Sequence, residues 1–208
     1  MSVSDRNRTI RWPGDPAGLT PETVDFEAVA HVLGNTCCWG GRSRRFYSLA
    51  QRAVTVSGAV AKLGGMTGAD RRVLCLHALL GNAGQAWMGA IAGTRPPGKG
   101  SDARLPDAAT VLRKVLEAAG AEPDLPGSWS QALELTQRMA EAAVYRDLAD
   151  AGMDRGAQRG GPQFPPLKER VRPLPPDRAA KQWLERFEAL RGPGGRQAPG
   201  EANGGRSG

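Results

Sequence analysis

The sequence predicts an all-α fold, an irregular helical bundle with a disordered basic C-terminal extension. Apolar residues recur at helical spacing in several long segments, whereas no segment shows the strict alternation of a half-buried strand. Glycine and proline are abundant, at 28 and 16 of 208 residues, and unevenly placed. That distribution favours a folded part beside a disordered part.

We expect three parts along the chain. Residues 1–20 form an extended N-terminal segment, residues 21–152 a helical domain, and residues 153–208 a basic tail rich in proline and glycine. In the domain, helices are expected over about 21–33, 44–63, 69–91, 106–119 and 128–148. Thr20 before Pro21 is a typical helix start, and Ser128 or Ser130 is a candidate cap for the last helix. A domain of this size has room for a core without disulfides.

The tail contains one short amphipathic helix near 177–191, for which Asp177 is the candidate cap. Residues 155–176 hold too many helix breakers for regular structure and suit a polyproline-like linker. Two interpretations of the helix are open: it folds back onto the domain, or it docks onto a protein partner. Its apolar face comprises Ala180, Trp183, Leu184, Phe187 and Leu190.

The net charge of +7 is concentrated in the tail, since residues 155–208 contain 11 Lys or Arg against 5 Asp or Glu. This charge permits weak, salt-sensitive contact between tail and nucleic acid, although GC-rich coding also enriches arginine. Three cysteines without framework spacing argue against a disulfide-built secreted domain. Without an apolar leader or an 18-residue apolar run, we expect a soluble, cytoplasmic protein with no membrane contact.

Chemistry-bearing motifs are scarce. The two histidines, His31 and His77, lie on separate apolar helices, which favours structural roles for both. Cys37 and Cys38 are adjacent rather than spaced as zinc ligands. The sequence has no phosphate-binding loop of the G-x-x-x-x-G-K-[ST] type and no G-x-S-x-G motif. Catalysis therefore does not follow from the residues alone.

Two long stretches resemble one family. Residues 24–57, VDFEAVAHVLGNTCCWGGRSRRFYSLAQRAVTVS, and residues 70–91, DRRVLCLHALLGNAGQAWMGAI, are similar to segments of the prophage-type and 5'-nucleotidase-like HD-domain phosphohydrolases. A weaker likeness covers 145–153, so the resemblance spans roughly residues 10–152. It implies an HD-type helical bundle. In the family, this bundle binds a catalytic divalent metal and a phosphate substrate.

The resemblance fails at the family's metal-binding positions. Gly81-Asn82 stands where the family has its His-Asp pair, and Arg52 replaces a family histidine. The degenerate positions are Arg52, Gly81, Asn82, Gln85, Ala90 and Gln137. A hydrolytic metal needs imidazole and carboxylate ligands, and arginine does not deprotonate to coordinate one. We therefore expect no metal cofactor, no catalytic residues and a catalytically inactive protein that acts as a binding or structural module.

The arginines leave a binding role open. Arg52 places a fixed charge where the metal would lie, and guanidinium groups grip phosphate bidentately. The predicted ligand group for a nucleotide or phosphate is Arg42, Arg44, Arg45, Arg52 and Asn82. Alternatively, these arginines are solvated or pair with acidic residues.

The alternative function is a metal-dependent nucleotide phosphohydrolase with shifted ligands. Those ligands would have to come from His31, His77, Asp70, Glu141 or Asp147.

Overall fold

The computed structural model describes residues 18–88, 107–149 and 164–191. Seven α-helices and two short 3-10 turns follow one another in these ranges, and an isolated bridge between Cys37 and Ser48 is the only strand-like pairing there. The all-α prediction is confirmed. The elements are η3 (Pro21–Thr23), α1 (Phe26–Asn35), η4 (Cys38–Gly41), α2 (Leu49–Val60), α3 (Gly68–Leu80), α4 (Gln85–Met88), α5 (Ala108–Ala118), α6 (Gly127–Leu148) and α7 (Pro176–Arg191).

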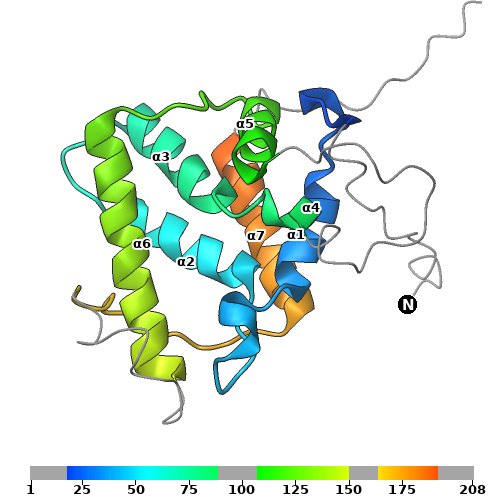
Figure 1. The fold of residues 1–208 in the computed structure, drawn as a ribbon. Coiled ribbons are helices and arrows are strands. Elements are labelled where there is room, and N and C mark those ends of the chain that lie inside the picture. Colours follow the sequence, from blue (N-terminus) through cyan, green and yellow to red (C-terminus); the bar gives the residue numbers. More distant parts are fainter. Residues whose placement is uncertain (1–17, 89–106, 150–163, 192–208) are drawn as a thin grey trace, which may run out of the picture.

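The last helix in the sequence occupies a central position in the fold (Figure 1). Helix α7 packs against α1, α2 and α3, and of these three helices α1 contacts it most extensively. Helix α2 also packs against α3 and α6, so α6 covers the far side of the bundle from α1. The bundle therefore closes around a helix that follows the predicted domain in sequence.

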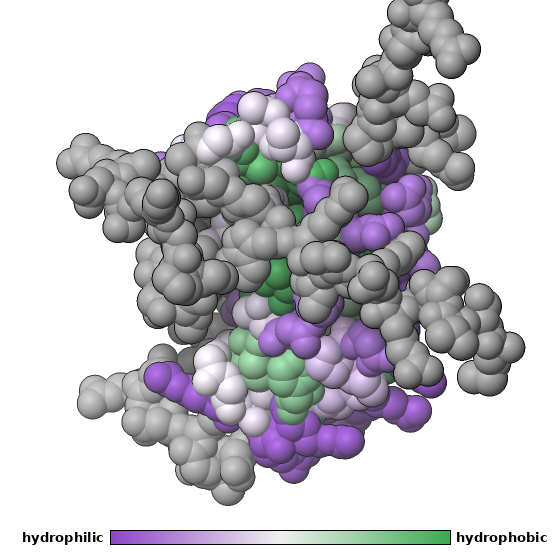
Figure 2. All heavy atoms as spheres, turned by 90° about the vertical axis from the view of Figure 1, so that its right-hand side faces the viewer, coloured by the Kyte–Doolittle hydropathy of each residue, from purple (hydrophilic) through white to green (hydrophobic). Residues whose placement is uncertain are grey.

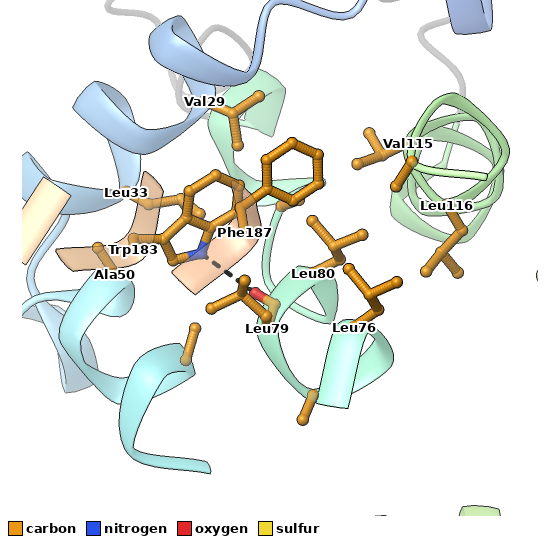
Figure 3. Close-up of a cluster of buried hydrophobic side chains, with 14 of the residues drawn as sticks. Val29, Leu33, Ala50, Leu76, Leu79, Leu80, Val115, Leu116, Trp183 and Phe187 are labelled. Carbon is orange, nitrogen blue, oxygen red and sulfur yellow. Dashed lines mark hydrogen bonds between the residues drawn. The ribbon is translucent and has the colours of Figure 1, made fainter. Parts of the chain in front are cut away.

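Two aromatic side chains of α7 form the centre of the core (Figure 3). Trp183 and Phe187 are fully buried, and they point among apolar side chains of α1, α2 and α3. The indole N–H of Trp183 donates a 3.2 Å hydrogen bond to the carbonyl oxygen of Leu79. Phe187 stacks on Phe26 with 4.1 Å between ring centroids. Burying each ring stabilises the folded state by about 2–3 kcal/mol, because apolar surface is removed from water.

This packing decides between the two interpretations of the C-terminal helix. Trp183, Phe187 and Leu190 are buried and Leu184 is half-buried, all against the chain's own domain. The fold-back interpretation is confirmed, and the same side chains are not exposed for a protein partner. The surface view in Figure 2 shows mostly hydrophilic residues around smaller hydrophobic areas. Among the described residues, the exposed large apolar side chains are Phe46 and Leu135.

The segment before α7, residues 164–175, is called the strap. It has no helix or strand, as its prolines predict, but it is fixed to the domain. The side-chain amide of Gln51 donates to the carbonyl of Arg172 (2.7 Å) and accepts from the backbone N–H of Leu174 (3.0 Å). The backbone N–H of Leu167 donates to the carbonyl of Met139. The described part of the predicted linker therefore lies against α2 and α6.

Several predicted helix ends were wrong. Thr20 and Pro21 begin a single 3-10 turn, and α1 starts later, where the Asp25 carboxylate accepts from the backbone N–H groups of Glu27 and Ala28. Ser48 caps α2, so residues 44–47 belong to the preceding loop. Asp177 lies inside the first turn of α7 rather than before it.

The third and fifth predicted helices also differ in detail. The segment expected to be one helix over 69–91 is α3, a turn at 81–84 and the short α4. Helix α6 begins at Gly127 after Pro126, without a side-chain cap from Ser128 or Ser130.

No helix in the described ranges combines the length and apolar character that crossing a bilayer requires.

Gly34 lies at a close contact between α1 and α7, so an added methyl group there should lower the stability of the fold. A Cβ at Gly34 would lie 2.7 Å from the carbonyl oxygen of Pro176 and 2.9 Å from the Cβ of Ala180. Because a backbone atom cannot move aside cheaply, we expect Gly34→Ala to lower the free energy of unfolding in urea by about 1–3 kcal/mol.

Gly58 of α2 is the matched control. An added Cβ there meets no atom within 4 Å, so Gly58→Ala should be neutral or stabilising by about 0.5–1 kcal/mol. Equal effects of the two changes would contradict the close packing of α7 on α1.

Candidate functional site

The positions that the resemblance assigns to a metal site converge only in part. Arg52 lies on α2, Gly81 follows the last turn of α3, and Gln137 and Glu141 lie one turn apart on α6. The side-chain nitrogen Nε2 of Gln137 is 4.0 Å from where a Cβ of Gly81 would be. Arg52 contacts Glu141. The structure thus brings residues of α2, α3 and α6 together at one junction, which we call the α2–α3–α6 junction.

An ion pair occupies this junction. An Nη atom of Arg52 donates to Oε1 of Glu141 at 2.7 Å, and the two side chains are 16% and 45% exposed. The partial burial of Arg52 strengthens the attraction relative to a fully solvated pair. The fixed positive charge expected at Arg52 is therefore compensated by a carboxylate four residues after Gln137. The alternative that the arginines pair with acidic residues is therefore correct for Arg52, although the sequence named Glu141 only as a candidate metal ligand.

Two buried ionisable groups, the Cys38 thiol and the Tyr47 hydroxyl, lie close to this ion pair. Burial raises the pKa of the Cys38 thiol to about 12, and the nearby Arg52 charge offsets the rise only in part. Burial likewise raises the pKa of the Tyr47 hydroxyl to about 12, against a hydrogen bond with Thr55. Both groups are neutral at physiological pH, so neither supplies a nucleophilic anion.

The other degenerate positions add little to the junction. Asn82 is half-buried in the turn after α3, and Gln85 is exposed at the start of α4. The carbonyl of Asn82 accepts from the backbone N–H of Gln85 at 3.0 Å, which shapes that turn. Ala90 lies outside the described residues.

The predicted ligand group is divided between two places. Arg42, Arg44 and Arg45 are exposed on the loop between α1 and α2. Arg44 and Arg45 line an open depression of about 720 Å³, whose other lining residues come from the end of α6 and from the strap. Neither Arg52 nor Asn82 lines it. The five residues therefore do not form one phosphate pocket.

The loop between α1 and α2 is closed tightly at its base. Cys37 and Ser48 form the isolated bridge, and the backbone N–H of Cys38 donates to the carbonyl of Tyr47 at 2.8 Å. Its reversal uses left-handed backbone at Trp39 (φ 54°) and Gly40 (φ 61°). Cys38 and Tyr47 then pack against α6 in a second small core, whose buried residues are Cys38, Tyr47, Val144 and Leu148. The loop is thus a fixed part of the structure.

Asp147 joins three segments at the end of α6. Its carboxylate is only 6% exposed and accepts from Arg146, from Arg170 (2.6 Å) and from the backbone N–H of Val171 (2.8 Å). Its backbone carbonyl accepts from Arg44 at 2.7 Å. The hydrogen bonds from Arg146, followed by those from Val171 and Arg170, hold the pKa of Asp147 far below its usual value. This residue therefore fixes both the loop and the strap to α6.

The five candidates for shifted metal ligands serve separate purposes. His31 is exposed on α1, and Asp70 lies in the first turn of α3. His77 meets the carbonyl of Glu122 through Nε2 at 2.7 Å, and burial lowers the pKa of its imidazole. Glu141 and Asp147 are held by arginines. In the ranges that the structure describes, no three His, Cys, Asp or Glu side chains are grouped closely enough to hold a metal ion.

Part of the predicted basic tail belongs to the folded core, which the sequence did not establish. Residues 164–191 carry seven of the eleven lysines and arginines of residues 155–208. Four of the seven lie on α7, which belongs to the core. Truncation after Gly152 would therefore remove core side chains together with charge. Nucleic-acid binding by the tail needs a test that leaves α7 in place.

Comparison with models of known protein families and with curated proteins found no match.

Asp147 predicts a specific dependence of stability on pH. Its pKa is lower in the folded than in the unfolded chain, where it is about 3.9. Its contribution is therefore complete above about pH 5 and is lost as the pH falls toward the folded value. We expect Asp147→Asn to lower the free energy of unfolding at pH 7 by about 1–3 kcal/mol, and by clearly less at pH 3.

Asp124 provides the control, because it also pairs with an arginine, Arg113, but is 83% exposed. Asp124→Asn should change stability by less than about 1 kcal/mol at either pH. If the effect of Asp147→Asn is equally small, or does not decrease on acidification, Asp147 does not hold the three segments together.

Proposed function

We propose that this chain is a non-hydrolytic helical module, a degenerate relative of the HD-domain phosphohydrolases that acts in binding or in structure rather than in catalysis. The observation that carries the proposal is the ion pair between Arg52 and Glu141 at the α2–α3–α6 junction. A cation that never deprotonates stands where the resemblance would place a metal-binding histidine. Its charge is balanced by a carboxylate of the same chain.

The neighbouring residues support the same conclusion. Gly81 offers no side chain to the junction, and Gln137 offers an amide, a poor ligand for a hydrolytic dication. Without a bound metal, no group at the junction would lower the pKa of an attacking water. The neutral thiol of Cys38 and hydroxyl of Tyr47 do not replace that function. Geometry and chemistry both favour a junction that stabilises the bundle.

Phosphate binding at Arg52 is less well supported than a structural role. Its guanidinium is mostly buried and hydrogen-bonded to Glu141, so a phosphate would have to displace that carboxylate. The exposed arginines of the loop lie in a different depression.

We place this module in the cytoplasm, because all three cysteines are free in the structure and reduced thiols are typical of that compartment.

The direct test combines metal analysis with a phosphatase screen. We expect the purified chain to hold no stoichiometric metal after equilibration with Mn²⁺, Co²⁺ or Mg²⁺, and to release no phosphate from nucleoside monophosphates. Bound metal at one per chain, with turnover that disappears in Asn82→Ala, would overturn the proposal.

A variant with the family's metal-ligand residues restored should gain metal binding. Arg52→His, Gly81→His, Asn82→Asp and Gln137→Asp together reinstate the residue types that the family uses. If the resemblance is correct, the variant should bind about one Mn²⁺ per chain, and we expect the natural chain to bind none. The control variant keeps the other three changes but carries Gln131→Asp, at an exposed position of α6, instead of Gln137→Asp. Equal metal binding by both would refute the assigned geometry.

A further inference from the structure

A second feature of the molecule lies outside the α2–α3–α6 junction. It is the open depression of about 720 Å³ between the loop after α1, the end of α6 and the strap. Three exposed arginines line it, Arg44 and Arg45 from the loop and Arg172 from the strap. Arg42, also exposed, belongs to the same loop. We call this surface the arginine depression.

The positive charge of the arginine depression is not cancelled by its lining. Asp147 is the only acidic lining residue, and its carboxylate is already bound by Arg146 and Arg170. Within the described ranges, Arg45 and Arg172 form no ion pair. Arg44 donates one hydrogen bond to a backbone carbonyl, which leaves its charge uncompensated. The surface therefore attracts anions.

The arginines are carried by backbone that is held in place. The backbone N–H of Arg44 donates to the carbonyl of Leu148 at 3.1 Å, and the carbonyl of Arg172 accepts from Gln51. The N–H of Val171 is bound by Asp147. Two separate segments thus present guanidinium groups on a common rigid base. A ligand that contacts them does not have to order the backbone first, which lowers the entropic cost of binding.

An exposed aromatic residue, Phe46, is the neighbour of Arg45 in the sequence. Phe46 directly follows Arg45 and is 38% exposed, although large apolar side chains elsewhere in the described ranges are mostly buried. Guanidinium groups bind phosphate oxygens, and an exposed ring stacks on an unpaired base. A bilayer surface would require a broad apolar face instead, which this polar depression does not offer.

We propose that the arginine depression binds single-stranded nucleic acid. Arg45 and Arg172 contact successive backbone phosphates, and Phe46 stacks on an unpaired base. The sequence interpretation assigned nucleic-acid contact to the basic tail and the loop arginines to a nucleotide pocket; the fold instead joins loop and strap in one surface. The proposal goes beyond a non-hydrolytic role and stands or falls independently of the metal assays.

Fluorescence anisotropy with a labelled single-stranded oligonucleotide of about 15 nucleotides tests the proposal on the full chain. We expect Arg45→Ala with Arg172→Ala to weaken binding at least tenfold and to reduce the slope of log K against log salt by about 2. Phe46→Ala should weaken binding with little change in that slope. Thermal unfolding by circular dichroism establishes that each variant is folded.

The matched control is Arg178→Ala with Lys181→Ala, which removes the same charge from exposed positions of α7. It should change affinity less than threefold. A second control, Arg196→Ala with Arg206→Ala, removes charge near the C-terminus and should also leave binding unchanged. An equal loss in either control would show that net charge, or the tail, carries binding, and would overturn the proposal.

The choice of nucleic acid has its own test. A duplex of the same length should bind more weakly, and free ATP or inorganic phosphate should compete only at concentrations far above those of the oligonucleotide. Stronger binding of the duplex, competition by ATP at equal concentration, or no binding at low salt would each refute a single-strand site.

Discussion

Burial of Trp183 and Phe187 is the interaction on which the rest of this fold depends. The two rings lie among side chains of α1, α2 and α3, so they connect the C-terminal helix α7 to three helices from the first half of the chain. The indole hydrogen bond to Leu79 satisfies the one polar atom that this burial would leave unpaired. Because α7 must reach the core, the strap must cross α2 and α6, and that route brings Arg170 and Val171 to Asp147.

The route of the strap has consequences for chemistry. It commits Asp147 to binding backbone and arginine groups, while Glu141, two turns earlier on α6, pairs with Arg52. The acidic residues of α6 that a metal site would need are therefore engaged in holding the bundle together. The same route places Arg172 beside the loop arginines. The strap thus accounts for the engagement of Asp147 and for the cationic surface, whereas the pairing of Glu141 follows from the packing of α2 against α6.

The sequence predicted the kind of structure better than its long-range pairings. Apolar spacing identified each major helix, since that pattern is a local property. Helix ends were less certain because several residues could serve as caps: Asp25 and Ser48 do so, whereas Ser128 and Asp177 do not. For the C-terminal helix, the amphipathic face was evident. An apolar face suits a partner as well as the chain's own core, so only the fold distinguished them.

At the candidate site, too, local features were predictable from the sequence and long-range pairings were not. The absence of imidazole and carboxylate at the compared positions was plain from residue identity. The pairing of Arg52 with Glu141, 89 residues away, was not, because no local pattern marks it. The only available signal was the spacing of Gln137 and Glu141, which places both on one side of a helix. The division of the arginines between two surfaces likewise required the path of the strap.

A double-mutant cycle on Arg52 and Glu141 tests most directly whether this junction is a structural ion pair. Free energies of unfolding would be measured in urea, with a chelator present, for Arg52→Met, Glu141→Gln and the double variant. A favourable coupling of about 1 kcal/mol is predicted, since the pair is partly buried and its N–O distance is 2.7 Å. A coupling indistinguishable from zero would contradict the account, because it would leave the Glu141 carboxylate free for other chemistry.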